Sequence, residues 1–137
     1  MNDYALAIHG GAGSVPSKHL LKFQAEYEDT LREALRIGER LFSISESASK
    51  IVTEVVCFLE DSDHFNAGKG SVLNHHGKVT MDAAFCDGNN RFYGGVVNIT
   101  HVKNPIKMAQ KLAYYEEHNI ISGKDALNFA KEHGLDL

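Results

Sequence analysis

Apolar residues recur at steps of three and four through the first third of the chain. The recurring positions are Leu20, Phe23, Tyr27, Leu31, Ala34, Leu35, Gly38 and Leu41. This spacing gathers them on one side of an α-helix and leaves the charged residues on the other. A serine-rich break, "SISESASK", supplies helix caps, and "IVTEVVCFLED" predicts a second helix.

Short apolar runs bounded by turn-forming residues predict strands. The run "YALAIHGG" from Tyr4 is typical of a buried strand. The stretch 71–100 predicts three strands joined by tight turns at "NHHGK" and "DGNNR". A third helix is expected to begin at Pro105, a favourable first helical residue, and the segment 120–134 adds a short strand and another helix.

The order of these elements is strand, two helices, three strands and then helices. This order is typical of an α+β or a layered α/β fold, and the tight turns favour an antiparallel sheet of about four strands. Because "YALAI", "TMDAAF" and "YGGVVNI" are apolar on both faces, helix layers are expected on both sides of the sheet. A length of 137 residues fits one domain with one core.

Composition and charge narrow the function classes. The chain is 43% hydrophobic and 23% charged, with a net charge of −4, and it has no basic cluster. These values argue against nucleic acid as a partner. With no apolar run as long as a membrane span and a start unlike a signal peptide, we expect a cytoplasmic protein that binds no membrane. Cys57 and Cys86 are expected to be reduced and mostly buried thiols.

The glycine-rich stretch 64–88, "HFNAGKGSVLNHHGKVTMDAAFCDG", does not match a phosphate-binding motif. A P-loop ends in Gly-Lys-Ser or Gly-Lys-Thr, whereas Gly68 and Lys69 are followed by Gly70. The glycine motif of a dinucleotide-binding loop is not matched either, because Gly11 and Gly13 are followed by Pro16 at the position of the motif's third glycine. Nucleotide binding is therefore disfavoured.

A transition-metal site and a nucleophile are equally hard to find. His75 and His76 are adjacent, so they point in different directions and fit a polar hairpin tip better than a shared ion. Ser71 and Cys86 lack the flanking residues of a known nucleophile motif. What remains is two glycine-rich loops at strand ends, whose backbone amides are available to hold an anion.

Five motifs occur in one order along the chain. They are "AIHGGAG" at 7–13, "FNAGKGSVL" at 65–73, "MDAAFCDG" at 81–88, "GGVVNI" at 94–99 and "VKNPIKMA" at 102–109. Each is unspecific alone, but in register they resemble the plant-type (type 2) L-asparaginases. This family, also called isoaspartyl peptidases, belongs to the N-terminal-nucleophile hydrolases. The resemblance covers essentially the whole chain.

The resemblance implies a specific architecture and chemistry. Family members cut their own precursor into an α and a β chain, and the new N-terminal Thr of the β chain is the nucleophile, with its own α-amine as base. They fold as a four-layer αββα sandwich and hydrolyse L-asparagine and β-aspartyl dipeptides. Residues 1–137 are therefore expected to be the α-subunit portion of one αββα domain, completed by a β subunit in an (αβ)2 heterotetramer.

One departure from the family pattern limits this expectation. The family's Thr-Val-Gly cleavage signature is absent, and Thr30, Thr53, Thr80 and Thr100 lie in helical or strand contexts. The nucleophile and the substrate-binding Arg and Asp are then expected on the β chain. The alternative is a truncated, catalytically inactive relative that acts as a binding or assembly module.

The resemblance also assigns site residues. Gly11 falls in the His-Gly-Gly loop, which touches the nucleophile and is tied to self-cleavage, and Asn66 matches an asparagine whose side chain lies close to the nucleophile. The segment 59–69 matches a loop that wraps a structural sodium ion with backbone carbonyls, and no other cofactor is implied. The matching residues are Leu59, Glu60, Ser62, Phe65, Ala67 and Lys69. Backbone oxygen ligands suit a hard cation. We therefore expect the ion to rigidify this loop as a support for Asn66.

Overall fold

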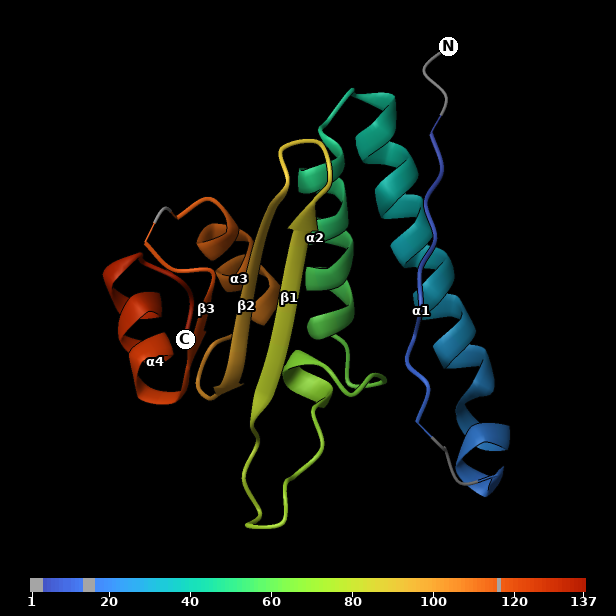
Figure 1. Cartoon of the computed structure of the whole chain (residues 1–137). Coiled ribbons are helices and arrows are strands. Elements are labelled where there is room, and N and C mark those ends of the chain that lie inside the picture. The colour runs from blue at the N-terminus through green and yellow to red at the C-terminus, as the bar shows by residue number, and fades with distance from the viewer. Residues whose placement is uncertain (1–3, 14–16, 116) are drawn as a thin grey trace.

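The computed structural model describes residues 4–13, 17–115 and 117–137 (Figure 1). The chain has a mixed α/β fold with a small sheet. Its elements are α1 (Ser17–Ser43), α2 (Ala48–Glu60), the 3-10 turn η1 (Gly68–Gly70), β1 (Met81–Asp87), β2 (Phe92–Ile99), α3 (Pro105–Ala113), β3 (Ile120–Ser122) and α4 (Gly123–Glu132). The helices predicted from apolar periodicity are all present. Ser47 caps α2 through its side chain, and Pro105 opens α3 as expected.

The sheet has the strand order β1-β2-β3. β1 and β2 form the antiparallel hairpin predicted at "DGNNR". The register shifts between Met81 and Ala83 of β1, and on the facing part of β2 Asn98 has φ 54°. Asp82 supports this irregularity by accepting the backbone N–H of Asn98 at 2.7 Å. β3 pairs with β2 in parallel, which corrects the expectation of a purely antiparallel sheet. The reason is that α3 lies between β2 and β3 in the chain and forms the crossover that parallel strands require.

The predicted strand at "YALAI" is wrong. The segment 4–10 is extended but pairs with no strand in the described part of the chain, and it runs alongside α1 (Figure 1). Tyr4 stacks on Phe42 with ring centroids 3.8 Å apart, and Leu6 packs over Gly38. Contact with the helices thus buries part of its apolar surface without a backbone ladder.

The first of the three strands predicted in 71–100 is reduced to one bridge. Leu73 pairs with Val79, and the turn between them is closed by the N–H of Asn74, which donates to the carbonyl of Lys78 at 2.8 Å. The Asn74 side chain accepts the N–H groups of His76 and Lys78. Such local side-chain bonds compete with a ladder, so the described sheet has three strands where about four were expected.

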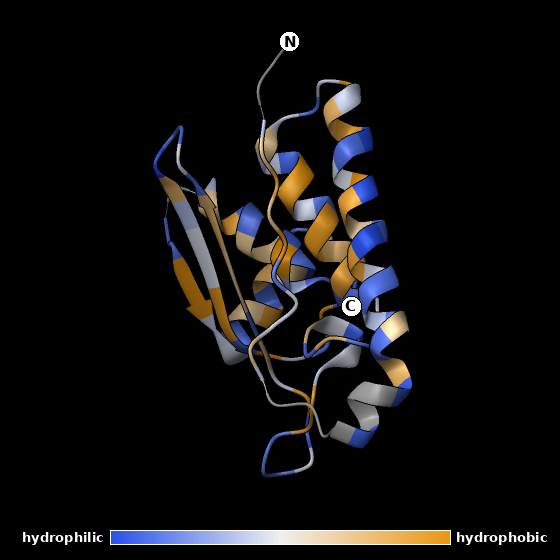
Figure 2. Ribbon diagram, turned by 90° about the vertical axis from the view of Figure 1, so that its right-hand side faces the viewer, coloured by the Kyte–Doolittle hydropathy of each residue, from blue (hydrophilic) through white to orange (hydrophobic). Residues whose placement is uncertain are grey.

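The two faces of the sheet have different surroundings. On one face, Phe85, Val96 and Ile99 are buried against α3, whose Met108 and Leu112 complete a core cluster. The other face is open, with the helices on one side of the sheet (Figure 2). It presents Ala84, Cys86, Tyr93, Val97 and Ile120, all exposed. The expectation of a buried thiol is therefore wrong for Cys86, which lies on this open face, whereas Cys57 is buried. Within the described residues, the expectation of helices on both faces is therefore wrong.

Helix α2 joins two separate core clusters. Its residues Ile51, Val55 and Leu59 pack in a cluster with Ala34 of α1 and with Phe65. Cys57, on another side of α2, belongs to the cluster of the sheet, α3 and α4. The helix is thus buried on two sides, and its position is fixed by both.

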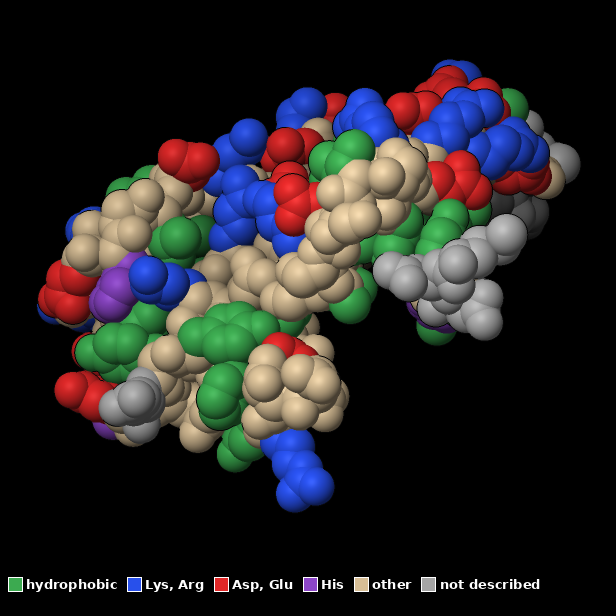
Figure 3. All heavy atoms as spheres, turned by 90° about the horizontal axis from the view of Figure 1, so that it is seen from above, with side chains coloured by type: hydrophobic (Ala, Val, Ile, Leu, Met, Phe, Trp, Pro, Cys, Tyr) green, Lys and Arg blue, Asp and Glu red, His purple; other side chains and the backbone are tan. Residues whose placement is uncertain are grey.

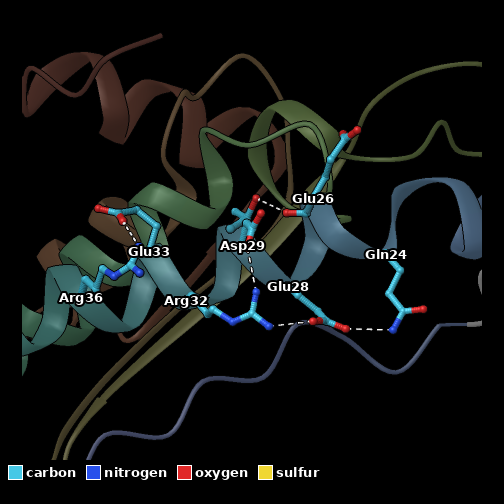
Figure 4. Close-up of polar contacts among 8 residues, drawn as sticks. Gln24, Glu26, Glu28, Asp29, Arg32, Glu33 and Arg36 are labelled. Carbon is cyan, nitrogen blue, oxygen red and sulfur yellow. Dashed lines mark hydrogen bonds and ion pairs between the residues drawn. The ribbon is translucent and has the colours of Figure 1, made fainter.

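The outer side of α1 is polar and exposed. Arg32 pairs with Glu28 at 2.8 Å and with Asp29 at 2.7 Å, and Arg36 pairs with Glu33 at 3.1 Å (Figure 4). Charged side chains line this helix in the space-filling view (Figure 3). Exposed pairs of this kind contribute little to stability. None of the helices in the described ranges has both the length and the apolarity that crossing a membrane requires.

We expect Gly94→Ala to destabilise the protein, because α3 packs directly on the backbone of Gly94. An added methyl group would lie 2.5 Å from the backbone nitrogen of Ala113 and would meet the carbonyl of Ala109. Overpacking of this kind costs about 1–3 kcal/mol. The matched control is Gly88→Ala, since nothing lies within 4 Å of a methyl group there. Urea unfolding is the measurement, and equal free energies of unfolding for the two variants would contradict the packing described.

Candidate functional site

Two glycine-rich motifs far apart in the sequence lie side by side. A methyl group on Gly10 would lie 3.0 Å from the ring of Phe65, which is buried. The His-Gly-Gly loop and the start of "FNAGKG" therefore touch. Gly11 has φ 108°, a conformation that favours glycine, and its N–H donates to Nδ1 of His9 at 3.0 Å. The structure thus brings the loop that holds Gly11 next to the residue that precedes Asn66.

Asn66 is exposed, and one end of its carboxamide is already engaged. Its Oδ1 accepts the backbone N–H of Val72 at 2.9 Å. Because a backbone N–H requires an acceptor, this bond identifies which end of the amide is oxygen. The Nδ2 group has no hydrogen-bond acceptor within the described residues. Asn66 therefore presents a free N–H donor at the surface of the site.

Backbone carbonyls pack closely against the glycines of the turn η1. A methyl group on Gly68, which has φ 52°, would collide with the carbonyl of Glu60. A methyl group on Gly70 would collide with the carbonyl of Phe65 and lie 2.9 Å from that of Ser62. Three of the six carbonyls assigned to sodium thus face η1 at positions that a side chain would fill. The carbonyl of Phe65 also accepts the N–H of Ala67 at 2.8 Å. Neutral carbonyl oxygens are a donor type that hard cations bind.

Two of the other three assigned residues also accept a backbone N–H through their carbonyls. The carbonyl of Leu59 accepts the N–H of Ser62 at 3.2 Å, and that of Ala67 accepts the N–H of Gly70 at 3.1 Å. The ammonium group of Lys69 pairs with Asp63 at 3.0 Å on the surface, so its charge is held by a carboxylate. The described residues contain no group of three His, Cys, Asp or Glu side chains suited to a metal ion. Any cation here would depend on the backbone.

The carboxyl group of Glu60 is a feature that the sequence analysis missed. Only 3% of Glu60 is exposed, and its Oε1 accepts the N–H of Ile106 at 3.0 Å, in the first turn of α3. Its Oε2 has no partner within the described residues. Burial raises the pKa of Glu60 to about 7, and the hydrogen bond from the N–H of Ile106 opposes this rise. The available signal was the spacing of Thr53, Cys57 and Glu60, which puts all three on one side of α2.

A cavity of about 190 Å³ lies between this loop, the start of β1 and the start of α3. Its lining is polar and includes two carboxyl groups. The lining residues are Glu60, Asn66, Ala67, Gly68, Ser71, Thr80, Met81, Asp82 and Pro105. The hydroxyl groups of Ser71 and Thr80 have no histidine or lysine beside them in this lining. No hydrogen bond joins either hydroxyl group to a carboxylate among the described residues, so the cavity carries hydrogen-bonding groups but no hydroxyl group held against a base.

Comparison with known proteins identifies relatives along nearly the whole chain. Residues 2–137 match the model of a family described as asparaginase. The chain is 35% identical over 136 residues to an isoaspartyl peptidase of Salmonella typhimurium, which covers 98% of this chain and 44% of the relative. It is 39% identical over 132 residues to a plant-type L-asparaginase of Thermococcus kodakarensis, covering 96% and 42%, respectively.

An isoaspartyl peptidase/L-asparaginase of Xenopus laevis is 37% identical over 130 residues, or 95% of this chain and 41% of the relative. The chain therefore spans about two fifths of the length of the curated relatives it matches. Both the family model and these identities extend across the helices, the sheet and the loop that holds Asn66. On this basis, the chain belongs to the asparaginase family.

Proposed function

We propose that the chain is the α portion of an asparaginase/isoaspartyl peptidase. The observation that carries the proposal is its match, nearly end to end, with relatives of that name, of which it covers only 41–44%. The remainder of such a protein would supply the N-terminal Thr as a β chain made by self-cleavage. The substrates would be L-asparagine and β-aspartyl dipeptides.

The proposed reaction divides the work between the two portions. The Thr hydroxyl attacks the side-chain carbonyl carbon of the substrate, and its proton passes to the Thr α-amine. The leaving nitrogen then takes this proton and departs as ammonia or as a free amine. Water then hydrolyses the ester. Asn66, with Nδ2 unengaged, would donate to the oxygen that becomes negative. The loop of Gly11 would contact the Thr residue.

The open face of the sheet is the proposed contact for the β chain. Tyr93, Val97 and Ile120 are exposed there at 53%, 45% and 64%. A second sheet packed on this face would bury them and produce the four-layer αββα sandwich. The unpaired segment 4–10 would then gain a neighbouring strand. The assembly would be (αβ)2, with residues 1–137 as the α-subunit part of the shared domain.

A sodium ion is the proposed ligand of the loop 59–69. The carbonyls of Glu60, Ser62 and Phe65 support this proposal, because they pack against Gly68 and Gly70 too closely for any side chain at these two positions. The ion would rigidify the backbone on both sides of Asn66 and would take no part in the reaction.

The function is tested by ammonia release from L-asparagine. We expect the 137-residue chain alone to give the same signal as buffer, because it does not contain the N-terminal Thr on which the proposed reaction depends. A longer protein that includes the family's β portion should give turnover, and replacement of its N-terminal Thr by Ala should abolish it. Turnover by the chain alone that a mutation within it abolishes would contradict the proposal. No turnover by the longer protein would favour the binding or assembly module.

The two cysteines test the interface with the β portion. Cys86 is exposed on the open face, whereas Cys57 is buried, and burial raises the pKa of the Cys57 thiol to about 12. In the chain alone, iodoacetamide at pH 8 should therefore modify Cys86 and spare Cys57. In the longer protein Cys86 should also be protected until urea is added. Mass spectrometry of peptides gives both rates, and equal Cys86 rates in the two proteins would exclude a covered face.

The cation is tested by amide exchange in the longer protein. Replacing Na⁺ by tetramethylammonium should reduce protection in residues 59–71 by about 1–2 kcal/mol, the size that binding linkage gives at moderate saturation. Gly70→Ala should remove this response, since its methyl group would occupy the space beside the carbonyl of Phe65. Amides of the turn 74–78 serve as the internal control. Exchange that is insensitive to the cation would count against the site.

A further inference from the structure

The backbone N–H of Val72 determines how Asn66 presents its side chain. It donates to Oδ1 of Asn66 at 2.9 Å. A carboxamide is planar, with oxygen and nitrogen on opposite sides of its carbon, so fixing the oxygen also fixes Nδ2. Without such a bond, the terminal torsion of asparagine is broad and roughly two-fold. The contact therefore selects one of two orientations.

Val72 itself is held by structure on both sides. Before it, the N–H of Ser71 donates to the carbonyl of Gly68 at 3.2 Å and ends the turn η1. After it, the pairing of Leu73 with Val79 opens a hairpin that projects from the body of the protein (Figure 1). The residue Val72 is 63% exposed, so burial of its side chain does not account for its placement. Its backbone N–H is the group that makes a defined contact.

We propose that the N–H of Val72 is a positioning group that holds Nδ2 of Asn66 as the donor to the developing oxyanion. The inference rests on the proposed function, in which Asn66 lies beside the nucleophile. A donor fixed in advance stabilises negative charge without reorganising during the reaction. The opposite orientation would present Oδ1, a negative dipole end, to the same oxyanion. The hairpin that begins at Val72 thereby becomes part of the active-site support.

Val72→Pro tests the proposal, because proline lacks the N–H. The preceding Ser71 has φ −60° and ψ 136°, the extended conformation that a residue before proline prefers. Val72→Ala is the matched variant, since it also removes the exposed side chain but keeps the N–H. In the longer protein, kcat of Val72→Pro should fall at least about tenfold below that of Val72→Ala, with similar KM. It should approach the loss of about 10²–10³ expected for Asn66→Ala. Equal kcat values for the two Val72 variants would overturn the proposal.

A second measurement does not depend on activity or on the fold of the proline variant. Hydrogen exchange at the Val72 amide should speed up in Asn66→Ala and remain slow in Asn66→Asp, whose carboxylate still accepts the bond. Asn66→Asp should nevertheless lose turnover, because it has no Nδ2 donor. Unchanged Val72 exchange in Asn66→Ala would overturn the positioning contact itself. Faster exchange combined with full turnover in Asn66→Ala would instead reject the proposed function of Asn66.

Discussion

The burial of α2 on two sides is the constraint on which the rest of the structure depends. Ile51, Val55 and Leu59 occupy one core cluster, and Cys57 occupies the other. A rotation of the helix would expose one of these sides, at roughly 1.5–3 kcal/mol for each large side chain returned to water. The C-terminal end of α2 is therefore held firmly, and the loop that carries Asn66 leaves from a fixed point.

Glu60 extends this constraint to α3. Burying a carboxylate is costly unless hydrogen bonds compensate, and the N–H of Ile106 at the start of α3 supplies one such bond at 3.0 Å. The same residue presses on η1 through its backbone, because Gly68 approaches its carbonyl too closely for any side chain. One residue thus links α2, α3 and the turn after Asn66. A displacement of any of these elements would therefore move the loop that carries Asn66.

The sequence predicted the elements that depend on local residue patterns and missed the features that depend on contacts between distant parts of the chain. Helix α1 follows from its apolar spacing, and the β1–β2 hairpin follows from "DGNNR". The segment 4–10 also reads as a strand, but strand pairing needs a neighbour, and no pattern within the segment specifies one. The parallel pairing of β3 depends on the path of α3 across the sheet. At the site, the family motif located Asn66. The carbonyls around η1 leave no side-chain signature in the sequence. The burial of the Glu60 carboxyl was not predicted, because glutamate is usually a surface residue.

The open sheet face and the unpaired segment 4–10 have the same physical cause. An interior strand needs neighbours on both edges and cover on both faces, and the described residues supply only part of each. Tyr93, Val97 and Ile120 would all lose exposed apolar surface to a partner on this face, since each is about half exposed or more. The cavity beside Asn66 has donors and acceptors, but among the described residues neither of its hydroxyl groups is hydrogen-bonded to a base. Under the proposed function, one β chain would account for both features, because it would cover the open face and supply the Thr nucleophile.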